Sequence, residues 1–349
     1  MLDAIAGARR QILLEMYLIE SGRIATRFID ALTAAAHRGV RVCLLLDGFG
    51  CRGFNAVDRD RLQAHGIKLV LYNPLQFGAL RRNLFRDHRK LLVVDDSHAF
   101  VGGAGISDMF DAEVQPNLHW HDAMVEIQGP LVADWQAVFA HNWAHWATAP
   151  TIAVDATGNK MGTQAGRVSL AGTDAHPTIK RTLVQRIARA GQRVWLATGY
   201  FVPSWKLRRR LARAARRGVD VRLLLPGPHT DHPAVRHAGR RFYRRLLLAG
   251  VRIYEYQPRF QHAKVALIDD WVAVGSSNLD RWNLRWNLEA NQEIDAPDFA
   301  AATVEMFTAD FAASHEYHAQ TWGRRSWVSH VAERFWGAVD RWLDRHARR

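Results

Sequence analysis

The sequence contains little cysteine and no long apolar run. Its two cysteines, Cys43 and Cys51, allow at most one disulfide, which argues against a disulfide-stabilised secreted fold and favours a reducing compartment. No run of about 18 or more apolar residues occurs, so no transmembrane helix is expected. Residues 1–4 lack the charged start and apolar stretch of a signal peptide. We therefore expect a chain that is neither exported nor embedded in a membrane.

Acidic residues are fewer than basic ones. The chain has 34 Asp and Glu against 47 Lys and Arg, a net charge of +13, and arginine runs are frequent between residues 208 and 245. A field of this sign attracts polyanions, either nucleic acid or an anionic membrane, although a solvated basic surface would give the same composition. With 349 residues, 48% of them hydrophobic, the chain is long enough for two ordinary domains or one large one.

The chain repeats one pattern of residues. Residues 36–48 are echoed at residues 215–227, an offset of 179 positions, and residues 10–15 are echoed at residues 192–197, an offset of 182 positions. Each longer copy predicts a helix that is closed by a glycine and followed by a buried strand and a turn. The offset is too long for a solenoid and fits two copies of an α/β unit.

Strands alternate with helical segments within each copy. This predicts an α/β fold of two pseudo-symmetric halves, each a mixed, mostly parallel sheet flanked by helices, with the active site at their interface. The predicted divisions are residues 1–155, residues 156–325 and an amphipathic basic helix at residues 326–349, with the linker between the halves in residues 151–166.

Each half carries one His-x-Lys-x-x-x-x-Asp motif. The motif residues are His88, Lys90 and Asp95 in the first half, and His262, Lys264 and Asp269 in the second. Residues two apart on a strand face the same side, so each histidine projects with its lysine, and each aspartate follows the strand in a turn. A single motif of this kind is more often a surface pair. Two motifs at equivalent places in a duplication are hard to ascribe to chance.

Pairing two such strands about a pseudo-twofold axis would bring two imidazoles and two ammonium groups to one pocket. The lysines would repel a cation, so we expect no metal and no cofactor. They would instead stabilise charge that builds on the oxygens of a phosphorus centre. One histidine would attack phosphorus while the other protonates the leaving alcohol and then deprotonates the incoming one. The six motif residues are therefore the predicted catalytic residues, and a phosphohistidine is the predicted intermediate.

Small residues follow each motif. Glycines and short polar side chains let backbone amides and hydroxyls approach a phosphate closely, so Gly103, Ser276 and Asn278 are the predicted phosphate-binding residues. As an isolated string, Gly-Ser-Ser-Asn would indicate only a turn.

A nucleophilic histidine needs a hydrogen-bond acceptor on its other ring nitrogen. Asp122, 34 residues after His88, and Glu289, 27 residues after His262, are the predicted acceptors. Both lie in or beside apolar-rich strands, with ordinary surface carboxylates as the alternative interpretation. The competing candidates are Glu113 and Glu293.

The paired motifs resemble the phospholipase D superfamily. The short sequence segments around them resemble the bacterial cardiolipin synthases, in particular the cardiolipin synthase B group. These segments are Asp47-Gly48-Phe49-Gly50, Asn83-Leu84-Phe85-Arg86, Phe100-Val101-Gly102-Gly103, Gly129-Pro130-Leu131-Val132-Ala133-Asp134, Gly275-Ser276-Ser277-Asn278-Leu279-Asp280 and Asn287-Leu288-Glu289-Ala290-Asn291. The resemblance covers about residues 3–315. It departs at Gly105, near which the synthases carry an asparagine, so Asn278 has no counterpart in the first half.

The resemblance implies a phosphatidyltransferase that moves a phosphatidyl group to phosphatidylglycerol through a phosphohistidine and makes cardiolipin. Phosphatidylglycerol, with phosphatidylethanolamine as a second candidate donor, would be the substrate, and by analogy His88 would be the nucleophile. The protein would act peripherally on an anionic membrane, at the cytoplasmic face of the bacterial cell membrane. The oligomeric state is left open.

Two other functions remain as alternatives. The first is a phospholipase D-type phosphodiesterase, a lipid hydrolase or a nuclease, in which water replaces the alcohol. Nucleic acid is not the expected partner, because the chain has no aromatic-rich RNA-binding signature. The second is a non-catalytic basic binder, which would need cations but not paired imidazoles.

Two segments are predicted to contact a membrane. Residues 75–85 mix apolar and basic residues just ahead of the first motif. Residues 326–349 place apolar residues four apart with arginines between them, a pattern typical of an interfacial helix, or equally of a helix that packs on the protein's own core.

Overall fold

The computed structural model describes residues 1–79, 81–148, 152, 154, 162–172, 178–280, 286–323, 333 and 335–339. The chain forms two compact units. The first unit comprises Met1–Ile179, Val274–Ser277 and Arg285–Ile294, and the second comprises Lys180–Ala273, Asn278–Leu284 and Asp295–Arg349. Two short stretches from late in the chain therefore belong to the first unit.

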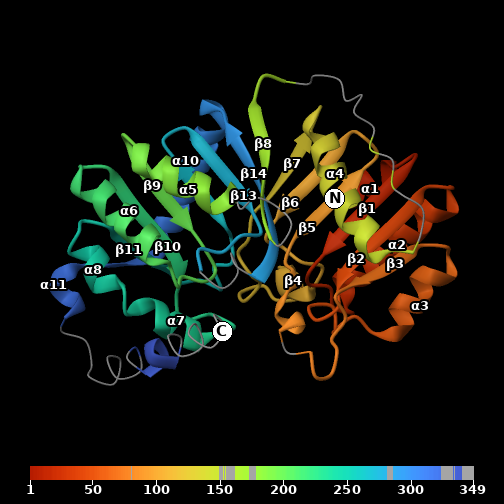
Figure 1. Ribbon diagram of the computed structural model, residues 1–349, viewed down its shortest axis with the longest axis horizontal. Helices are drawn as coiled ribbons and strands as arrows, with labels where there is room; N and C mark the ends of the chain where they lie inside the picture. The colour runs from red at the N-terminus through yellow and green to blue at the C-terminus, as the bar shows by residue number, and fades with distance from the viewer. Residues whose placement is uncertain are drawn as a thin grey trace. The chain divides into compact units, whose positions relative to one another are not determined.

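The first unit is built on a mixed sheet with the strand order β3-β2-β1-β5-β6-β7 (Figure 1). Its strands are β1 (Gln11–Met16), β2 (Arg41–Asp47), β3 (Lys68–Tyr72), β5 (Lys90–Val94), β6 (His98–Gly102) and β7 (Met124–Gln128). Strands β1, β2 and β3 run parallel because helices connect them, whereas β5, β6 and β7 continue antiparallel. The predicted mixed sheet is confirmed, with more antiparallel pairing than expected.

Helices cover both faces of this sheet. They are α1 (Leu2–Gly7), α2 (Arg23–His37), α3 (Ala56–Ala64) and α4 (Leu131–Trp146), with short 3₁₀ turns at Arg82–Leu84 and Asp108–Phe110. Alternate residues of β1 serve the two faces. Leu14 and Met16 share a core with Phe28 of α2, whereas Glu15 faces α4 and accepts a hydrogen bond from Asn142.

A second ladder in the first unit holds the start of the first motif. The short strand β4 (Arg86–Asp87) pairs in parallel with β14 (Asn287–Asp295), which also pairs with β8 (Ala165–Ala171). The amide of His88 donates to the carbonyl of Leu288 at 3.0 Å. A strand from late in the sequence thus fixes the backbone at the first motif histidine.

The second unit repeats the design, with the strand order β15-β11-β10-β9-β12-β13. Its strands are β9 (Arg193–Ala197), β10 (Asp220–Pro226), β11 (Arg252–Tyr256), β12 (Val265–Ile268), β13 (Trp271–Gly275) and β15 (Ser314–Tyr317). Its helices are α5 (Thr178–Arg189), α6 (Trp205–Arg216), α7 (Pro233–Arg240), α8 (Tyr243–Leu247), α10 (Pro297–Ala312) and α11 (Ala319–Trp322) (Figure 1).

The internal duplication is confirmed at the level of single hydrogen bonds. Gly39 (φ 87°) closes α2 and donates to Ala36, and Gly218 (φ 88°) closes α6 and donates to Ala215, both at 2.9 Å. The left-handed conformation at both positions suits glycine. In both units, three parallel strands are followed by an antiparallel strand that begins at the motif lysine or directly after it.

Most of the predicted linker at residues 151–166 and most of residues 326–349 lie outside the described residues. Within the latter segment, Glu333 is buried and its Oε1 lies 3.9 Å from Nε of Arg240. In the part of the chain that the structure describes, no helix combines the length and the apolar character needed to cross a bilayer.

Candidate active site

In the first unit, a buried carboxylate orients the histidine of the first motif. Nδ1 of His88 lies 3.0 Å from Oε1 and 3.1 Å from Oε2 of Glu289, a side chain with no solvent exposure. An acceptor on Nδ1 fixes the proton there and leaves Nε2 with its lone pair, which is the form that a nucleophile requires. Glu289 was predicted as an acceptor, but its partner is the histidine of the other motif and not His262.

Ser276 contacts the same Glu289 carboxylate. Its hydroxyl donates to Oε2 of Glu289 and accepts from the amide of Ala290 at 3.1 Å. The hydroxyl hydrogen is therefore directed at the carboxylate, whereas the sequence predicted that Ser276 would bind phosphate. We propose that Ser276 holds Glu289 in place.

Lys90 and an unpredicted tyrosine surround His88. Nζ of Lys90 is buried and donates to the carbonyl of His88 at 2.6 Å. The ring of Tyr17 meets the His88 ring edge-on, with centroids 4.7 Å apart, and lies 5.0 Å below the Lys90 ammonium. Burial, and then the charge of Asp47, raise the pKa of Tyr17 to about 12, so its hydroxyl stays protonated. Its position directly after a buried strand was the only sequence signal for Tyr17.

The motif aspartates do not lie with the histidines in either unit. Asp95 (φ 51°) accepts hydrogen bonds from the amides of residues 9, 10 and 11 at 2.8–3.0 Å. Asp269 (φ 52°) accepts from the amides of residues 191, 192 and 193 at 2.8–3.1 Å. Each aspartate therefore ties the turn after its motif strand to the start of the neighbouring strand. We propose a positioning role for both, in place of the predicted catalytic one.

In the second unit, the motif histidine and lysine are in direct contact. Nζ of Lys264 lies 2.8 Å from both ring nitrogens of His262, and both side chains are buried. The ring of Phe260 lies 5.4 Å from the His262 ring. The sequence prediction that each histidine projects with its lysine therefore agrees with the geometry in this unit.

A polar side chain with an unused donor lies beside His262. Asn278 has no solvent exposure, its Oδ1 accepts from Thr198 at 3.3 Å, and its Nδ2 has no protein partner among the described residues. A Cβ atom placed on Gly199 would lie 3.1 Å from Cδ2 of His262 and 3.4 Å from Oδ1 of Asn278. The absence of a side chain at Gly199 thus leaves room where the two residues meet.

Gly103 and Asp122 occupy the places in the first half that Ser276 and Glu289 occupy in the second. The amide of Gly103 donates to Ala123 and the amide of Ser276 donates to Ala290, each at 3.1 Å. A Cβ atom on Gly103 would lie 2.3 Å from Oδ1 of Asp122, so any larger residue there would require that carboxylate to move. Gly103 is thus packed on Asp122, and the phosphate-binding role predicted for it remains a proposal.

The two competing carboxylates form other ion pairs. Glu113 is exposed and lies 2.6 Å from Arg23. Glu293 is buried, and its Oε2 accepts from Nε of Arg167 at 2.7 Å. These pairings account for both side chains without a histidine.

A buried acid pair lies on the α4 side of the first motif. Nδ2 of Asn142 donates to Oε1 of Glu15 and to Oδ2 of Asp87, each at 2.9 Å. Burial, and then the neighbouring Glu15, raise the pKa of Asp87 well above its usual range. Asp87 therefore holds its proton to higher pH than an ordinary aspartate does, and it shares a hydrogen bond with Glu15.

The raised pKa makes stability depend on pH. The unfolded chain releases this proton near the ordinary aspartate pKa of about 4, below the folded-state pKa, so the free energy of unfolding falls as pH rises between the two values. The substitution Asp87→Asn removes the ionisable carboxyl group and keeps a hydrogen-bond donor for Glu15. We expect the melting temperature of the native protein to fall, relative to the variant, as the pH rises above about 4. Calorimetry of both proteins and of the exposed control Asp3→Asn tests this, and parallel pH curves would contradict it.

Asp47, which sequence reasoning used only for the resemblance, also supports the site. One carboxylate oxygen accepts from the amides of Phe49 and Gly50 at 2.8 Å, and the other accepts from the amide of Asp87 at 2.9 Å. The end of β2 is thereby bound to the residue that precedes His88. A group of three or more histidine, cysteine or acidic residues suited to a metal ion was not found in the described part of the chain.

Comparisons with known proteins identify the family of the chain. A family model described as "Cardiolipin synthase, PLD-like domain" matches residues 1–143 and 183–311. Cardiolipin synthase A of Pseudomonas aeruginosa is 35% identical over 322 residues, which cover 91% of this chain and 65% of that protein. Cardiolipin synthase 2 of Bacillus anthracis is 30% identical over 339 residues, which cover 95% of this chain and 66% of that protein. The chain thus spans about two thirds of the length of these curated relatives.

Solved structures show the same fold at low sequence identity. Phosphatidylserine synthase of Haemophilus influenzae Rd KW20 is similar with a TM-score of 0.73 and 13% identity, over 99% of this chain and 90% of that chain. Polyphosphate kinase of Porphyromonas gingivalis is similar with a TM-score of 0.61 and 15% identity, over 91% of this chain and 46% of that chain. Since the family model covers well over half of the residues, the chain belongs to the phospholipase D superfamily, within the family of cardiolipin synthase-like domains.

Proposed function

We propose that this protein is a phosphatidyltransferase that moves a phosphatidyl group to phosphatidylglycerol and forms cardiolipin. The observation that carries the proposal is the contact of Nδ1 of buried His88 with the carboxylate of Glu289 at 3.0 Å. A carboxylate-oriented imidazole beside a lysine is suited to attack phosphorus, and relatives of this chain are named cardiolipin synthases.

The proposed reaction has two displacements. Nε2 of His88 attacks the phosphorus of one phosphatidylglycerol, a P–N bond forms, the P–O bond to glycerol breaks, and His262 protonates the departing alkoxide. His262 then removes the proton from the glycerol hydroxyl of a second phosphatidylglycerol, whose oxygen attacks phosphorus and displaces His88. Two molecules of phosphatidylglycerol give one cardiolipin and one glycerol. Lys90, Lys264 and Nδ2 of Asn278 would stabilise the phosphorus oxygens.

Lipid product analysis tests the proposal. Purified protein is incubated with phosphatidylglycerol vesicles, with and without phosphatidylethanolamine, and the products are separated by mass. Cardiolipin with glycerol is the expected result, and ethanolamine release in the mixed vesicles would identify a second donor. Phosphatidic acid without cardiolipin would show hydrolysis, and cleavage of single-stranded DNA in a parallel reaction would show a nuclease. Either result would overturn the proposal.

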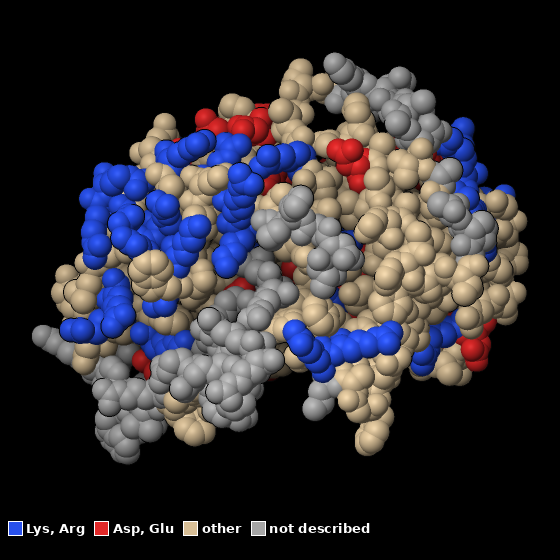
Figure 2. All heavy atoms as spheres, in the orientation of Figure 1, with Lys and Arg blue, Asp and Glu red and all other residues tan. Residues whose placement is uncertain are grey.

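We infer that the protein works as a peripheral protein on an anionic membrane. In the first unit, Leu75, Phe77 and Leu84 are among the most exposed large apolar side chains, and Arg81 and Arg82 beside them are exposed. In the second unit, Lys and Arg side chains gather over α5 and α6 (Figure 2). Apolar residues next to cations are suited to the interface of an anionic bilayer.

The basic face of α6 should contribute strongly to membrane binding. Leu207, Leu211 and Ala214 are buried, so the exposed arginines at positions 209, 213 and 216 point to solvent. Replacing these three arginines by glutamine should weaken binding to phosphatidylglycerol vesicles by roughly 100-fold at moderate salt, since each basic residue near such a surface contributes about 1 kcal/mol. Vesicle co-sedimentation measures the change.

A charge-matched variant controls for the general loss of positive charge. It replaces three exposed arginines of the first unit, Arg9, Arg27 and Arg52, by glutamine. An equal loss of binding in both triple variants would show that net charge, and not the α6 surface, attracts the membrane.

A further inference from the structure

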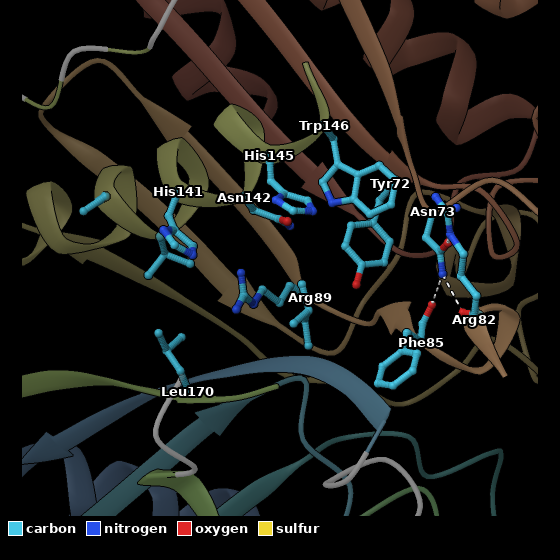
Figure 3. A pocket seen from close by; sticks show the side chains of 13 residues that line it. Tyr72, Asn73, Arg82, Phe85, Arg89, His141, Asn142, His145, Trp146 and Leu170 are labelled. Atoms are coloured by element: carbon cyan, nitrogen blue, oxygen red, sulfur yellow. Dashed lines mark hydrogen bonds between the residues drawn. The ribbon is translucent and has the colours of Figure 1, made fainter. Parts of the chain in front are cut away.

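A cavity of about 640 Å³ lies in the first unit, and His88 is not among the residues that line it. Figure 3 shows its lining side chains, which come from β3, the segment around Arg82, the residue after His88, and helix α4. The residues that line it are Tyr72, Asn73, Arg82, Phe85, Arg89, Ala137, Val138, His141, Asn142, His145, Trp146, Leu170 and Leu288. Volumes of this size are typical of small-molecule sites.

Strand alternation separates this cavity from the candidate active site. His88 is held by Glu289, whereas the next residue, Arg89, and the preceding residue of β14, Leu288, line the cavity. Neighbouring residues on a strand point to opposite faces. The residues next to His88 and Glu289 therefore line the cavity, whereas His88 and Glu289 themselves do not.

The polar part of the cavity is cationic. Arg89 is 6% exposed, and its Nε has no hydrogen-bond partner among the described residues. Nη1 of Arg89 lies 3.4 Å from Oε1 of Glu15, and the end of the guanidinium group points into the cavity (Figure 3). Arg82, His141 and His145 stand at the exposed rim, and none of the lining residues is acidic. A lining that has basic groups and no acidic ones favours an anionic ligand over a cationic one.

The remainder of the lining is apolar and aromatic. Tyr72 and Trp146 pack with ring centroids 4.8 Å apart, and Phe85, Val138 and Leu288 add apolar surface. A free inorganic anion would leave this surface in contact with water, whereas an anion that carries a hydrocarbon chain would cover it. The chemistry of the wall therefore favours an amphiphile.

The rim of the cavity is continuous with an exposed apolar segment. Arg82 and Phe85 line the cavity, and the same segment exposes Leu75, Phe77 and Leu84 to solvent. A lipid that leaves a bilayer along these side chains would reach the cavity without crossing open water. This continuity supports a lipid as the source of the anion.

We propose that this cavity is an accessory site for an anionic lipid, whose phosphomonoester is bound by Arg89 and Arg82 and whose chain lies against Trp146 and Phe85. The proposal concerns binding and not turnover, so it does not depend on the proposed transferase activity.

Calorimetric titration with monomeric lysophosphatidic acid tests the site. A matched pair of variants on α4 separates the cavity from the surface around it. Ala137 is exposed and lines the cavity, whereas Ala144 is exposed on the same helix and does not line it. Ala137→Trp should weaken binding at least ~10-fold by filling the cavity, and Ala144→Trp should leave it unchanged. Arg82→Gln should weaken it roughly 10-fold by removing a charged donor. Melting curves confirm that each variant is folded.

Two further ligands identify the chemistry. Monoacylglycerol, which lacks the phosphate, should bind far more weakly, and glycerol 3-phosphate, which lacks the chain, should do the same. If glycerol 3-phosphate binds as tightly as lysophosphatidic acid, the site is one for soluble phosphate esters and the lipid proposal is overturned. Binding that is equal in Ala137→Trp and the native protein would place the ligand elsewhere, including the catalytic pocket, and would also overturn it.

Discussion

Replacing His88 by alanine should lower phosphatidyl transfer at least ~10⁴-fold and abolish the phosphohistidine that a denaturing quench at alkaline pH traps. The physical reason lies in the first unit, where the carboxylate of Glu289 holds the proton on Nδ1 of His88, so that Nε2 carries the lone pair that attacks phosphorus. The measurement uses phosphatidylglycerol labelled with ³²P, followed by denaturing electrophoresis at alkaline pH, at which phosphohistidine is stable.

The matched variant His262→Ala separates the two histidine roles. With an activated donor such as phosphatidyl-p-nitrophenol, the leaving group needs no proton, so the first displacement should proceed without His262. The second displacement lacks its base, and the phosphoenzyme should accumulate with the release of one equivalent of nitrophenolate. Trapping in His88→Ala but not in His262→Ala would reverse the assignment of the nucleophile. Trapping of a phosphoenzyme in both variants would contradict a mechanism in which the two motifs act on one phosphorus.

Glu289→Gln should lower kcat by roughly 10³-fold with little change in KM. The amide would present an NH₂ group to Nδ1 of His88 and favour the tautomer that carries the proton on Nε2. The nucleophile would thus be lost although the ring stays in place. Because the substrate does not touch Glu289 in this scheme, binding should be largely retained.

Glu293→Gln is the control for this prediction. Glu293 lies on the same strand and is also buried, but its carboxylate pairs with Arg167 and not with a histidine. We expect a kcat near that of the native protein. Equal losses in the two variants would indicate that any buried charge change in β14 disturbs the fold, and that Glu289 has no special function.

The repeated pattern was sufficient to predict the fold. Glycine caps, buried strands and the motifs occur twice with similar offsets, and hydrogen bonds at Gly39 and Gly218 confirm that the copies fold alike. Such features depend on local chemistry and on strand periodicity, which a single sequence displays. The antiparallel pairing of β5, β6 and β7 was harder to predict from the sequence, because it depends on short connections between buried strands.

The roles of individual site residues were harder to predict. The aspartate at the end of each motif looks catalytic in the sequence, but its partners are amides that lie more than 75 residues away along the chain, as for Asp269 and Gly191. Glu289 was identified as an acceptor, yet its partner could not be, because no local pattern shows that β14 pairs with β4. Tyr17 carries no motif and owes its position to packing alone.

The pairing of β14 with β4 bears on how the duplicated gene arose. A half-length ancestor that ended before the repeat would have supplied the imidazole of His88 but not the carboxylate that polarises it, since that carboxylate comes from the later copy. Such an ancestor would have needed a second identical molecule to supply the strand. Fusion of the two genes would then have placed both strands in one chain, and each copy could change on its own. Tyr17 and Gly199, which are equivalent positions at an offset of 182, differ in this way.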